Sequence, residues 1–280
     1  MNNESQFRDI RKDIIVFHNK NEIPYISAPH LHSQYEIYYN ISGARGFMLN
    51  GNFYKCSEKD LIIIPKVQTH KAIVNKNSIY ERCIINIDSY VIELLEILCH
   101  SQSTFSWLTS ESVENVKTAN LSEEEHTQFM ELVYEYNNSK DKDKVEMLDS
   151  FLKLMLFLKK AFAASKKTDV LDESGLSYSD RVMNIIEHNF KTITVSEIAN
   201  EIFVSEDYLN RLFKEETGQT IGQYLIMRKL AEAKKNIYLG KSVKEASILS
   251  GFRDYSNFIR TFKKYEGYSP SGLDGLTEPI

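Results

Sequence analysis

The sequence predicts an α+β protein, with a small β-barrel at the N-terminus, helices after it, and an all-α C-terminal domain. Three observations lead to this prediction. Short β-rich runs fill residues 1–88, helical periodicity replaces them over residues 89–164, and residues 179–280 have helical patterns throughout. Residues 165–178 are polar and lack periodicity, so we expect an interdomain linker there.

Length and composition are those of an ordinary globular protein. The 280 residues are about right for two domains, with 42% hydrophobic and 26% charged side chains. The longest aliphatic run, residues 61–64, is far shorter than the roughly 20 residues that a membrane helix needs. The N-terminus lacks the apolar core of a signal peptide, and the three cysteines form no CxxC pair. We therefore expect a cytoplasmic protein with reduced thiols and no membrane contact.

The net charge of −5 does not indicate a general affinity for nucleic acid. Residues 178–280 hold 14 basic and 14 acidic side chains, so the acidic excess lies in residues 1–177. Nucleic-acid-binding domains usually carry a net positive charge. A DNA-binding function must therefore rest on local pattern in this chain.

The N-terminal region has the pattern of short strands separated by turns. Asn50-Gly51 is a strong hairpin signal because both residues tolerate a positive φ, and Ser42-Gly43 marks another turn. Many short strands without intervening helices are typical of a small barrel or sandwich. The expected strands cover residues 13–17, 35–41, 46–50, 60–65, 70–74 and 82–87.

Three helices are expected between the barrel and the linker. The second has Ser122 as its N-cap and three glutamates in its first turn, where the helix dipole favours them. The third, residues 143–165, is apolar on two faces and must therefore cover two surfaces. Either it is buried within one subunit, or one face packs on the barrel and the other on a partner chain. The second interpretation predicts a homodimer formed through residues 89–164.

A repeat organises the C-terminal domain. The chain repeats RLFKEETG, residues 211–218, as RTFKKYEG, residues 260–267, with an offset of 49. Each copy follows a short helix with a capping box, Thr194 with Glu197 and Ser242 with Glu245. A short helix, a tight turn and a second amphipathic helix form the pattern of a helix-turn-helix unit. One long helix, residues 222–240, is expected between the copies and is closed by Gly240.

The second helix of each unit is expected to begin at Ser205 or Asp254, with an apolar inward face and a polar outward face. Arginine and asparagine bind guanine and adenine bidentately, while lysines and helix N-termini bind phosphates. Two such helices on a stiff connector can enter adjacent major-groove segments about 34 Å apart. The alternative to DNA binding is a plain helical bundle with ordinary surface charge. Two copies of the pattern at matched spacing argue against this alternative. The expected DNA-binding residues are Asp207, Asn210, Arg211, Lys214, Ser256, Asn257, Arg260 and Lys263.

The second copy carries a specific family signature. It has Gly251-Phe252, Asp254, Phe258, Arg260-x-Phe262-Lys263, Gly267 and Pro270. Residues 180–271 resemble the double helix-turn-helix domain of the AraC/XylS family of bacterial transcription regulators. The resemblance implies a regulator, more often an activator than a repressor, that binds double-stranded promoter DNA as a homodimer and works with RNA polymerase. Residues 271–280 depart from the family, which usually has an aromatic residue and an arginine after the proline, so we expect a weaker last helix.

The N-terminal region resembles the cupin-type ligand-binding domain usual in the same family. His30, His32, Glu36 and Gly43 follow the spacing of the first cupin motif, and residues 65–70 end in His70 like the second, although Val67 replaces the usual glycine. By strand alternation, the even-numbered residues 30–40 are expected on one polar face and the odd-numbered residues 31–41 on an apolar face.

Three interpretations of the polar face remain open. It is exposed to water, it lines a cavity for a small polar effector such as a sugar, or His30, His32, Glu36 and His70 bind a divalent metal ion. Three imidazoles and a carboxylate suit Zn, Fe, Mn or Ni. The expected effector-binding residues are His30, His32, Glu36, Tyr38 and His70, with Phe47, Phe53 and Tyr54 as further walls.

The expected function is an effector-responsive DNA-binding regulator that is not an enzyme and needs no cofactor. One rival is a metal-binding cupin, acting as a metal sensor or a metal-dependent enzyme, with an accessory DNA-binding module. Another is a regulator whose barrel receives a protein in place of a metabolite. The sequence identifies neither the effector nor the operator.

Overall fold

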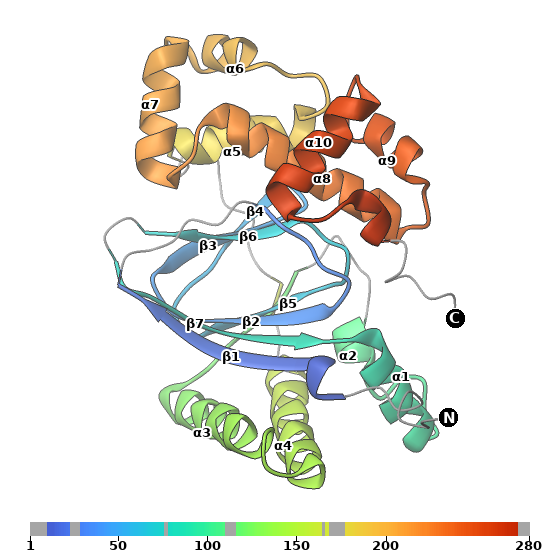
Figure 1. The fold of residues 1–280 in the computed structure, drawn as a ribbon. Coiled ribbons are helices and arrows are strands. Elements are labelled where there is room, and N and C mark those ends of the chain that lie inside the picture. The colour runs from blue at the N-terminus through green and yellow to red at the C-terminus, as the bar shows by residue number, and fades with distance from the viewer. Residues whose placement is uncertain are drawn as a thin grey trace.

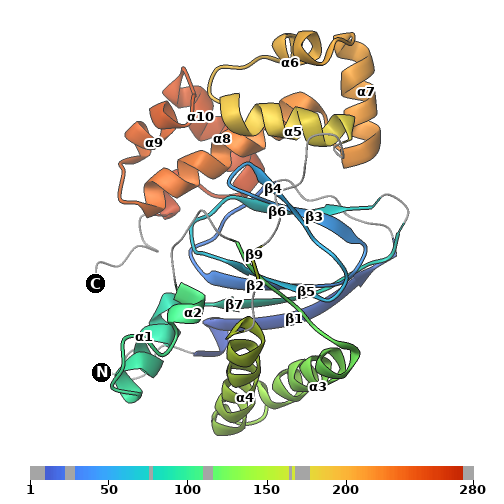
Figure 2. The same cartoon turned by 180° about the vertical axis from the view of Figure 1, so that it is seen from behind.

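A computed structural model describes residues 10–22, 29–75, 78–109, 116–163, 166–167 and 177–273. Two antiparallel sheets form the centre of the molecule (Figure 1). Helices α3 and α4 cover the larger sheet, and the C-terminal helices lie against the smaller sheet on the opposite side, as the reverse view also shows (Figure 2). The α+β fold class predicted from the sequence is confirmed.

The larger sheet has the strand order β1-β7-β2-β5-β8-β9, and the smaller sheet has the order β4-β3-β6. The predicted hairpin turn at Asn50-Gly51 joins β3 to β4, and both of its residues have positive φ. The strands are β1 (Ile14–Asn21), β2 (Tyr35–Ser42), β3 (Ala44–Leu49), β4 (Asn52–Lys55), β5 (Asp60–Ile64), β6 (His70–Val74), β7 (Tyr80–Ile87), β8 (Lys117–Asn120) and β9 (Lys166–Lys167).

Strands β8 and β9 differ from the expectation drawn from the sequence. The β8 strand lies in the region expected to be helical, and β9 lies in the expected linker. The β8 strand pairs antiparallel with β5, where Ala119 stands opposite Leu61, and β9 continues the sheet beside β8. Such short segments become strands because the exposed edge of β5 offers unpaired backbone groups, a long-range condition that local sequence does not show.

Strand alternation divides the barrel residues among three cores. Tyr38 and Phe47 belong to a cluster drawn from both sheets, so they fill the space between them. Tyr39, the next residue after Tyr38, packs among residues of α3 and α4 on the outer face of the larger sheet. Met48, the next after Phe47, packs among residues of the C-terminal helices. Each fully buried side chain of this kind contributes about 1.5–3 kcal/mol to folding.

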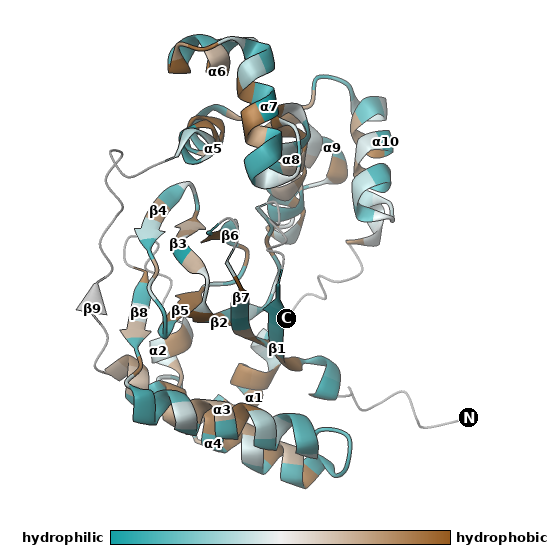
Figure 3. Ribbon diagram, turned by 90° about the vertical axis from the view of Figure 1, so that its left-hand side faces the viewer, coloured by the Kyte–Doolittle hydropathy of each residue, from teal (hydrophilic) through white to brown (hydrophobic). Residues whose placement is uncertain are grey.

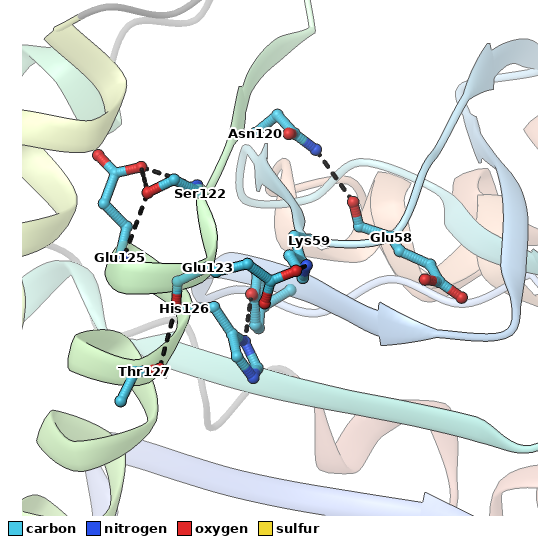
Figure 4. Close-up of polar contacts among 9 residues, drawn as sticks. Glu58, Lys59, Asn120, Ser122, Glu123, Glu125, His126 and Thr127 are labelled. Carbon is cyan, nitrogen blue, oxygen red and sulfur yellow. Dashed lines mark hydrogen bonds and ion pairs between the residues drawn. The ribbon is translucent and has the colours of Figure 1, made fainter.

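The helices between the barrel and the C-terminal domain are α1 (Ser89–Leu98), α2 (Ser106–Thr109), α3 (Glu123–Ser139) and α4 (Lys144–Ala163). Ser122 caps α3 as predicted, and the Glu125 carboxylate accepts from the Ser122 amide and hydroxyl, both at 2.8 Å (Figure 4). Lys59 and Glu123 form an ion pair at the start of the same helix. The Lys59–Glu123 pair holds the start of α3 against the turn before β5.

Helix α4 has one buried and one exposed apolar face. Phe151, Leu154 and Leu158 are buried against the larger sheet. Leu152 and Leu156 are 45% and 55% exposed. Figure 3 shows hydrophobic and hydrophilic positions mixed along α3 and α4. One of the two apolar faces of α4 therefore packs on the barrel, and the other face is uncovered in the single chain.

The C-terminal domain contains six α-helices among its described residues: α5 (Tyr178–Asn189), α6 (Val195–Ile202), α7 (Glu206–Thr217), α8 (Ile221–Tyr238), α9 (Val243–Leu249) and α10 (Tyr255–Glu266). Both predicted capping boxes are formed, Thr194 with Glu197 and Ser242 with Glu245. Gly240 closes the α8 region with a φ of 79°, as predicted. Short 3-10 turns lie at Ile10–Lys12 and Pro270–Gly272. No helix within the described ranges has the length and apolar character needed to cross a membrane.

Candidate DNA-binding helices and the histidine cluster

Two helix-turn-helix units occupy the ends of the C-terminal domain. The first consists of α6 and α7, the second of α9 and α10, and α8 connects them (Figure 1). Ser205 and Asp254 cap α7 and α10 as predicted, with the Asp254 carboxylate accepting from the amide of Asn257 at 2.6 Å. The inward faces are buried: Leu209 and Phe213 in one core, Phe258 and Phe262 in another.

Seven of the eight residues predicted to contact DNA are exposed. Arg211 stacks over the ring of Tyr208 at 5.6 Å, which holds its side chain along the helix surface. Arg260, its counterpart in the repeat, donates from Nε to the carbonyl of Ser256 at 3.4 Å. The exposed set is Asp207, Arg211, Lys214, Ser256, Asn257, Arg260 and Lys263.

Asn210 differs from the other seven. Its side chain is half-buried, and Oδ1 accepts a hydrogen bond from the amide of Ile221 at 3.3 Å. Ile221 is the first residue of α8, so Asn210 joins the first recognition helix to the connector. This bond occupies one of the two atoms that an asparagine uses to bind adenine.

The four residues of the predicted histidine cluster come together where strands β2 and β6 begin. His30 and His70 form an isolated antiparallel bridge, with backbone bonds of 3.1 and 2.9 Å. The ring centroid of His70 lies 4.4 Å from that of His30 and 5.0 Å from that of His32. Nε2 of His32 and Nε2 of His70 lie 2.7 and 3.6 Å from Oε2 of Glu36.

The position of the histidines corrects one expectation. His30 and His32 do not share a strand with Glu36, because β2 begins at Tyr35. They lie on the segment before β2. The amide of Val67 donates a hydrogen bond of 2.8 Å to the carbonyl of His32 in this segment. Exposure falls across the cluster: His30 is exposed, His32 is half-buried, and Glu36 and His70 are buried.

The carboxylate at the centre of the cluster is held in its charged form. Burial raises the pKa of Glu36, but the charge of His70 and the hydrogen bond from His32 outweigh burial and hold the pKa well below its ordinary value. A buried carboxylate of this kind requires positive charge close by.

The other predicted effector residues separate. Tyr38 lies inside the barrel, where its hydroxyl is 3.1 Å from that of Tyr80 and its ring is 5.1 Å from Phe47. Phe47 in turn stacks on His70 at 6.1 Å, so Phe47 lies between the ring of Tyr38 and the cluster. Tyr54 lies in the same interior core. Phe53, expected to line the same cavity, faces the C-terminal helices instead, because adjacent residues of β4 point to opposite sides.

The smaller sheet meets helices α5 and α8 of the C-terminal domain at a contact that the sequence did not reveal. Lys71 is 1% exposed, and its Nζ lies 3.3 Å from Sδ of Met183 and 5.2 Å from the ring centre of Tyr224. Burial lowers the pKa of Lys71 to about 8, although Asp180 and Glu187 oppose this shift. A cavity of about 220 Å³ opens beside it, lined by residues of β6, α5 and α7.

Comparison with known proteins gives a match for each half of the chain. Residues 14–115 match the family description "AraC-like ligand binding domain", and residues 198–274 match "Helix-turn-helix domain". The chain belongs to the AraC family. It combines an AraC-like ligand-binding domain with a C-terminal helix-turn-helix domain.

The relatives of this AraC-family chain include several regulators. Over 89 residues it is 37% identical to an uncharacterized HTH-type transcriptional regulator in the cgkA 5' region of Pseudoalteromonas carrageenovora, covering 31% of this chain and 53% of that protein. It is 30% identical over 130 residues to the Msm operon regulatory protein of Streptococcus mutans, covering 45% of each. The chain thus spans about half the length of these curated relatives. Among solved structures, ToxT from Vibrio cholerae aligns over 96% of this chain and 100% of its own, at 15% identity and a TM-score of 0.41.

Proposed function

We propose that this AraC-family regulator reads two adjacent major-groove segments of one DNA duplex with α7 and α10. The observation that carries the proposal is the exposure of matched side chains on two helices 49 residues apart, with Arg211 and Arg260 at the same place in the repeat. Both helices are held by buried aromatic residues, so their outward faces have a fixed geometry. Arginine in this position suits bidentate binding of guanine.

Binding of DNA fragments by the purified full chain tests this proposal. Arg260→Ala and Arg211→Ala should each weaken specific binding by about 1–3 kcal/mol and relax the preference at one base step. Lys214→Ala and Lys263→Ala should weaken binding to all sequences and reduce the salt dependence by about one counterion. Lys142→Ala, an exposed lysine outside the C-terminal domain, serves as the control. If Arg260→Ala leaves the sequence preference intact, the placement of α10 in the groove is wrong.

We further propose that the protein works as a homodimer through the exposed face of α4. Leu152 and Leu156 lie one turn apart on this face, and Lys153, between them, pairs with Glu135 of α3 at 2.7 Å. Apolar residues left uncovered in this way mark an interaction surface. Leu152→Asp with Leu156→Asp should convert a dimer to a monomer in light scattering, whereas a wild type that is already monomeric would contradict the proposal.

An effector bound by the barrel would act by binding one arrangement of the two domains more tightly than another. The contact between the smaller sheet and α5 supports this, because α5 shares one buried core with the first helix-turn-helix unit and with residues of the smaller sheet. Activation through RNA polymerase is expected of the family. Transcription from a bound promoter in a purified system, with and without the regulator, measures it, and a decrease would make the protein a repressor.

A further inference from the structure

We propose that the two helix-turn-helix units engage DNA in a fixed order. The second unit, α9 and α10, makes the first contact, and the first unit, α6 and α7, follows against the restraint of the barrel. This inference rests on the proposed function, because it assigns an order to the two groove contacts. Two differences between the units support it: their net charge and their attachment to the ligand-binding domain.

The two units have opposite net charges. From the N-cap of the first helix to the glycine that caps the second, residues 194–218 contain 2 basic and 6 acidic residues, a net charge of −4. Residues 242–267 contain 5 basic and 3 acidic residues, a net charge of +2. Because phosphates attract the second unit and repel the first, the encounter with DNA begins at the second unit. Its basic side chains are all exposed: Lys244, Arg253, Arg260, Lys263 and Lys264.

The difference in charge extends to the ends of the recognition helices. Glu206 and Asp207 are exposed in the first turn of α7, whereas the first turn of α10 contains no acidic residue after its cap Asp254. Helix N-termini are positions at which phosphates bind. Insertion of α7 therefore brings two carboxylates toward the DNA backbone, and this contact forms less readily than that of α10.

The two units also differ in the buried cores that hold them. Leu209 and Phe213 of α7 belong to a core that includes residues of the smaller sheet. Phe258 and Phe262 of α10 belong to a core drawn, among the described residues, from positions 226–273 alone. The first unit therefore shares a core with the barrel, and the second unit has its own. The barrel members of the first core are Met48, Phe53 and Ile73.

The connecting helix α8 is divided between these two cores. Ile221 and Tyr224, in its first turn, pack in the core that includes the smaller sheet. Leu230 and Ile237, farther along, pack in the core of the second unit. The boundary between the part of the C-terminal domain attached to the barrel and the part that carries α10 thus lies within α8.

Polar contacts reinforce the attachment of the first part. Arg45 of β3 pairs with Asp180 of α5 at 2.5 Å, and Asp180 is 1% exposed. Glu216 and Thr217, at the end of α7, line the cavity of about 220 Å³ together with Arg45 and Lys71. The acidic end of α7 thus faces the same cavity as two basic residues of the barrel. Opposite charges on the two sides favour the attached arrangement.

This attachment opposes the second step of DNA binding. Two recognition helices fit successive major-groove segments only when their separation and orientation match the duplex. Once α10 is bound, α7 must adjust to the next groove segment while its core is still shared with the barrel. Any barrel contact that loosens during this adjustment is subtracted from the DNA affinity.

The rates of association and dissociation test the order of contact. They are measured by stopped-flow fluorescence with the full chain and a labelled DNA fragment that the wild type binds. Lys214 and Lys263 occupy the same place in the repeat. Each alanine variant should lose about 3–10-fold in affinity at about 0.1 M salt, the effect of one counterion. The loss should appear as slower association in Lys263→Ala and as faster dissociation in Lys214→Ala. The same division between the two rates in both variants, or the reverse assignment, would overturn the order.

Arg45→Glu tests the restraint by the barrel. It places a second carboxylate beside Asp180 and should slow dissociation from DNA by about 5-fold or more. Lys142→Glu is the matched control, because it makes the same change of charge at an exposed residue between α3 and α4, on the opposite side of the barrel (Figure 1). The added negative charge alone would weaken DNA binding. Dissociation as fast as in the control, or faster, would overturn the restraint.

Hydrogen exchange of the full chain without DNA separates this inference from the proposed function. Arg45→Glu should raise the exchange of amides in α5 and α7 and leave those of α10 as in the wild type, while Lys142→Glu should change neither. An equal rise in α7 and α10, or no rise in either, would overturn the division of the domain. If this pattern is found but the wild type binds no DNA fragment, the proposed function fails and the order of engagement fails with it, whereas the attachment of the first unit to the barrel stands.

Discussion

Phe203 has an unfavourable backbone conformation at the turn between α6 and α7. Its φ of 63° and ψ of 42° are left-handed, and the residue is 92% exposed. The same turn of the second unit has Gly251, with a φ of 83°. In both turns, the amide of the following residue donates a hydrogen bond to the carbonyl five positions before it. The N–O distance is 3.0 Å in the turn with Phe203 and 3.1 Å in the turn with Gly251. The first unit therefore uses a bulky residue where the second uses the residue suited to this conformation.

Replacing Phe203 by glycine should stabilise the C-terminal domain. The left-handed conformation costs a non-glycine residue about 1–2 kcal/mol. Glycine removes this cost but adds about 0.5–1 kcal/mol of backbone entropy to the unfolded chain. Because the residue is 92% exposed, almost no burial is lost. The expected net gain in the free energy of unfolding is about 0.5–1 kcal/mol.

Thermal unfolding followed by circular dichroism measures this gain, which should raise the midpoint of the helical transition by about 2–8 °C. Phe203→Ala is the matched control and should give no such rise, because alanine keeps the left-handed strain. Gly251→Ala should lower the midpoint, since its Cβ would lie 2.7 Å from the carbonyl oxygen of Lys191. A lower midpoint for Phe203→Gly, or an equal rise for Phe203→Ala, would refute the reasoning.

Three further changes test other contacts. Burial lowers the pKa of Lys71 from 10.5 to about 8, so between these pH values the unfolded chain binds more protons than the folded chain. The free energy of unfolding in urea should therefore increase as the pH rises from about 8 toward about 10. Lys71→Met should abolish that increase. Arg228→Met should cost about 3–5 kcal/mol in urea unfolding because it leaves the buried carboxylate of Glu187 without its partner, and adding Glu187→Leu should recover most of the loss. Gly43→Ala should cost more than about 1 kcal/mol in thermal unfolding, because Gly43 has a φ of 88° and an added Cβ would overlap the carbonyl oxygen of Ile79.

Local pattern in the sequence was enough to predict most of the fold and one of the two candidate sites. Strand alternation, hairpin signals and capping boxes depend on residues within a few positions of one another, and the structure forms them where the sequence places them. The 49-residue repeat likewise places Arg211 and Arg260 on the outward faces of two matched helices. Such features follow from short-range backbone and side-chain chemistry, which the order of residues specifies directly.

The tertiary structure decided which distant surfaces meet. The sequence placed the histidines and Glu36 on one strand face, whereas folding brings His30 and His70 together by a bridge between two segments. It also determined that Phe53 and Lys71 face the DNA-binding domain, and that β8 extends the larger sheet. A strand has two faces and a sheet has two edges, and local periodicity does not say which neighbour covers each one. Only the packing of residues far apart in the chain, with the burial it achieves, selects among those partners.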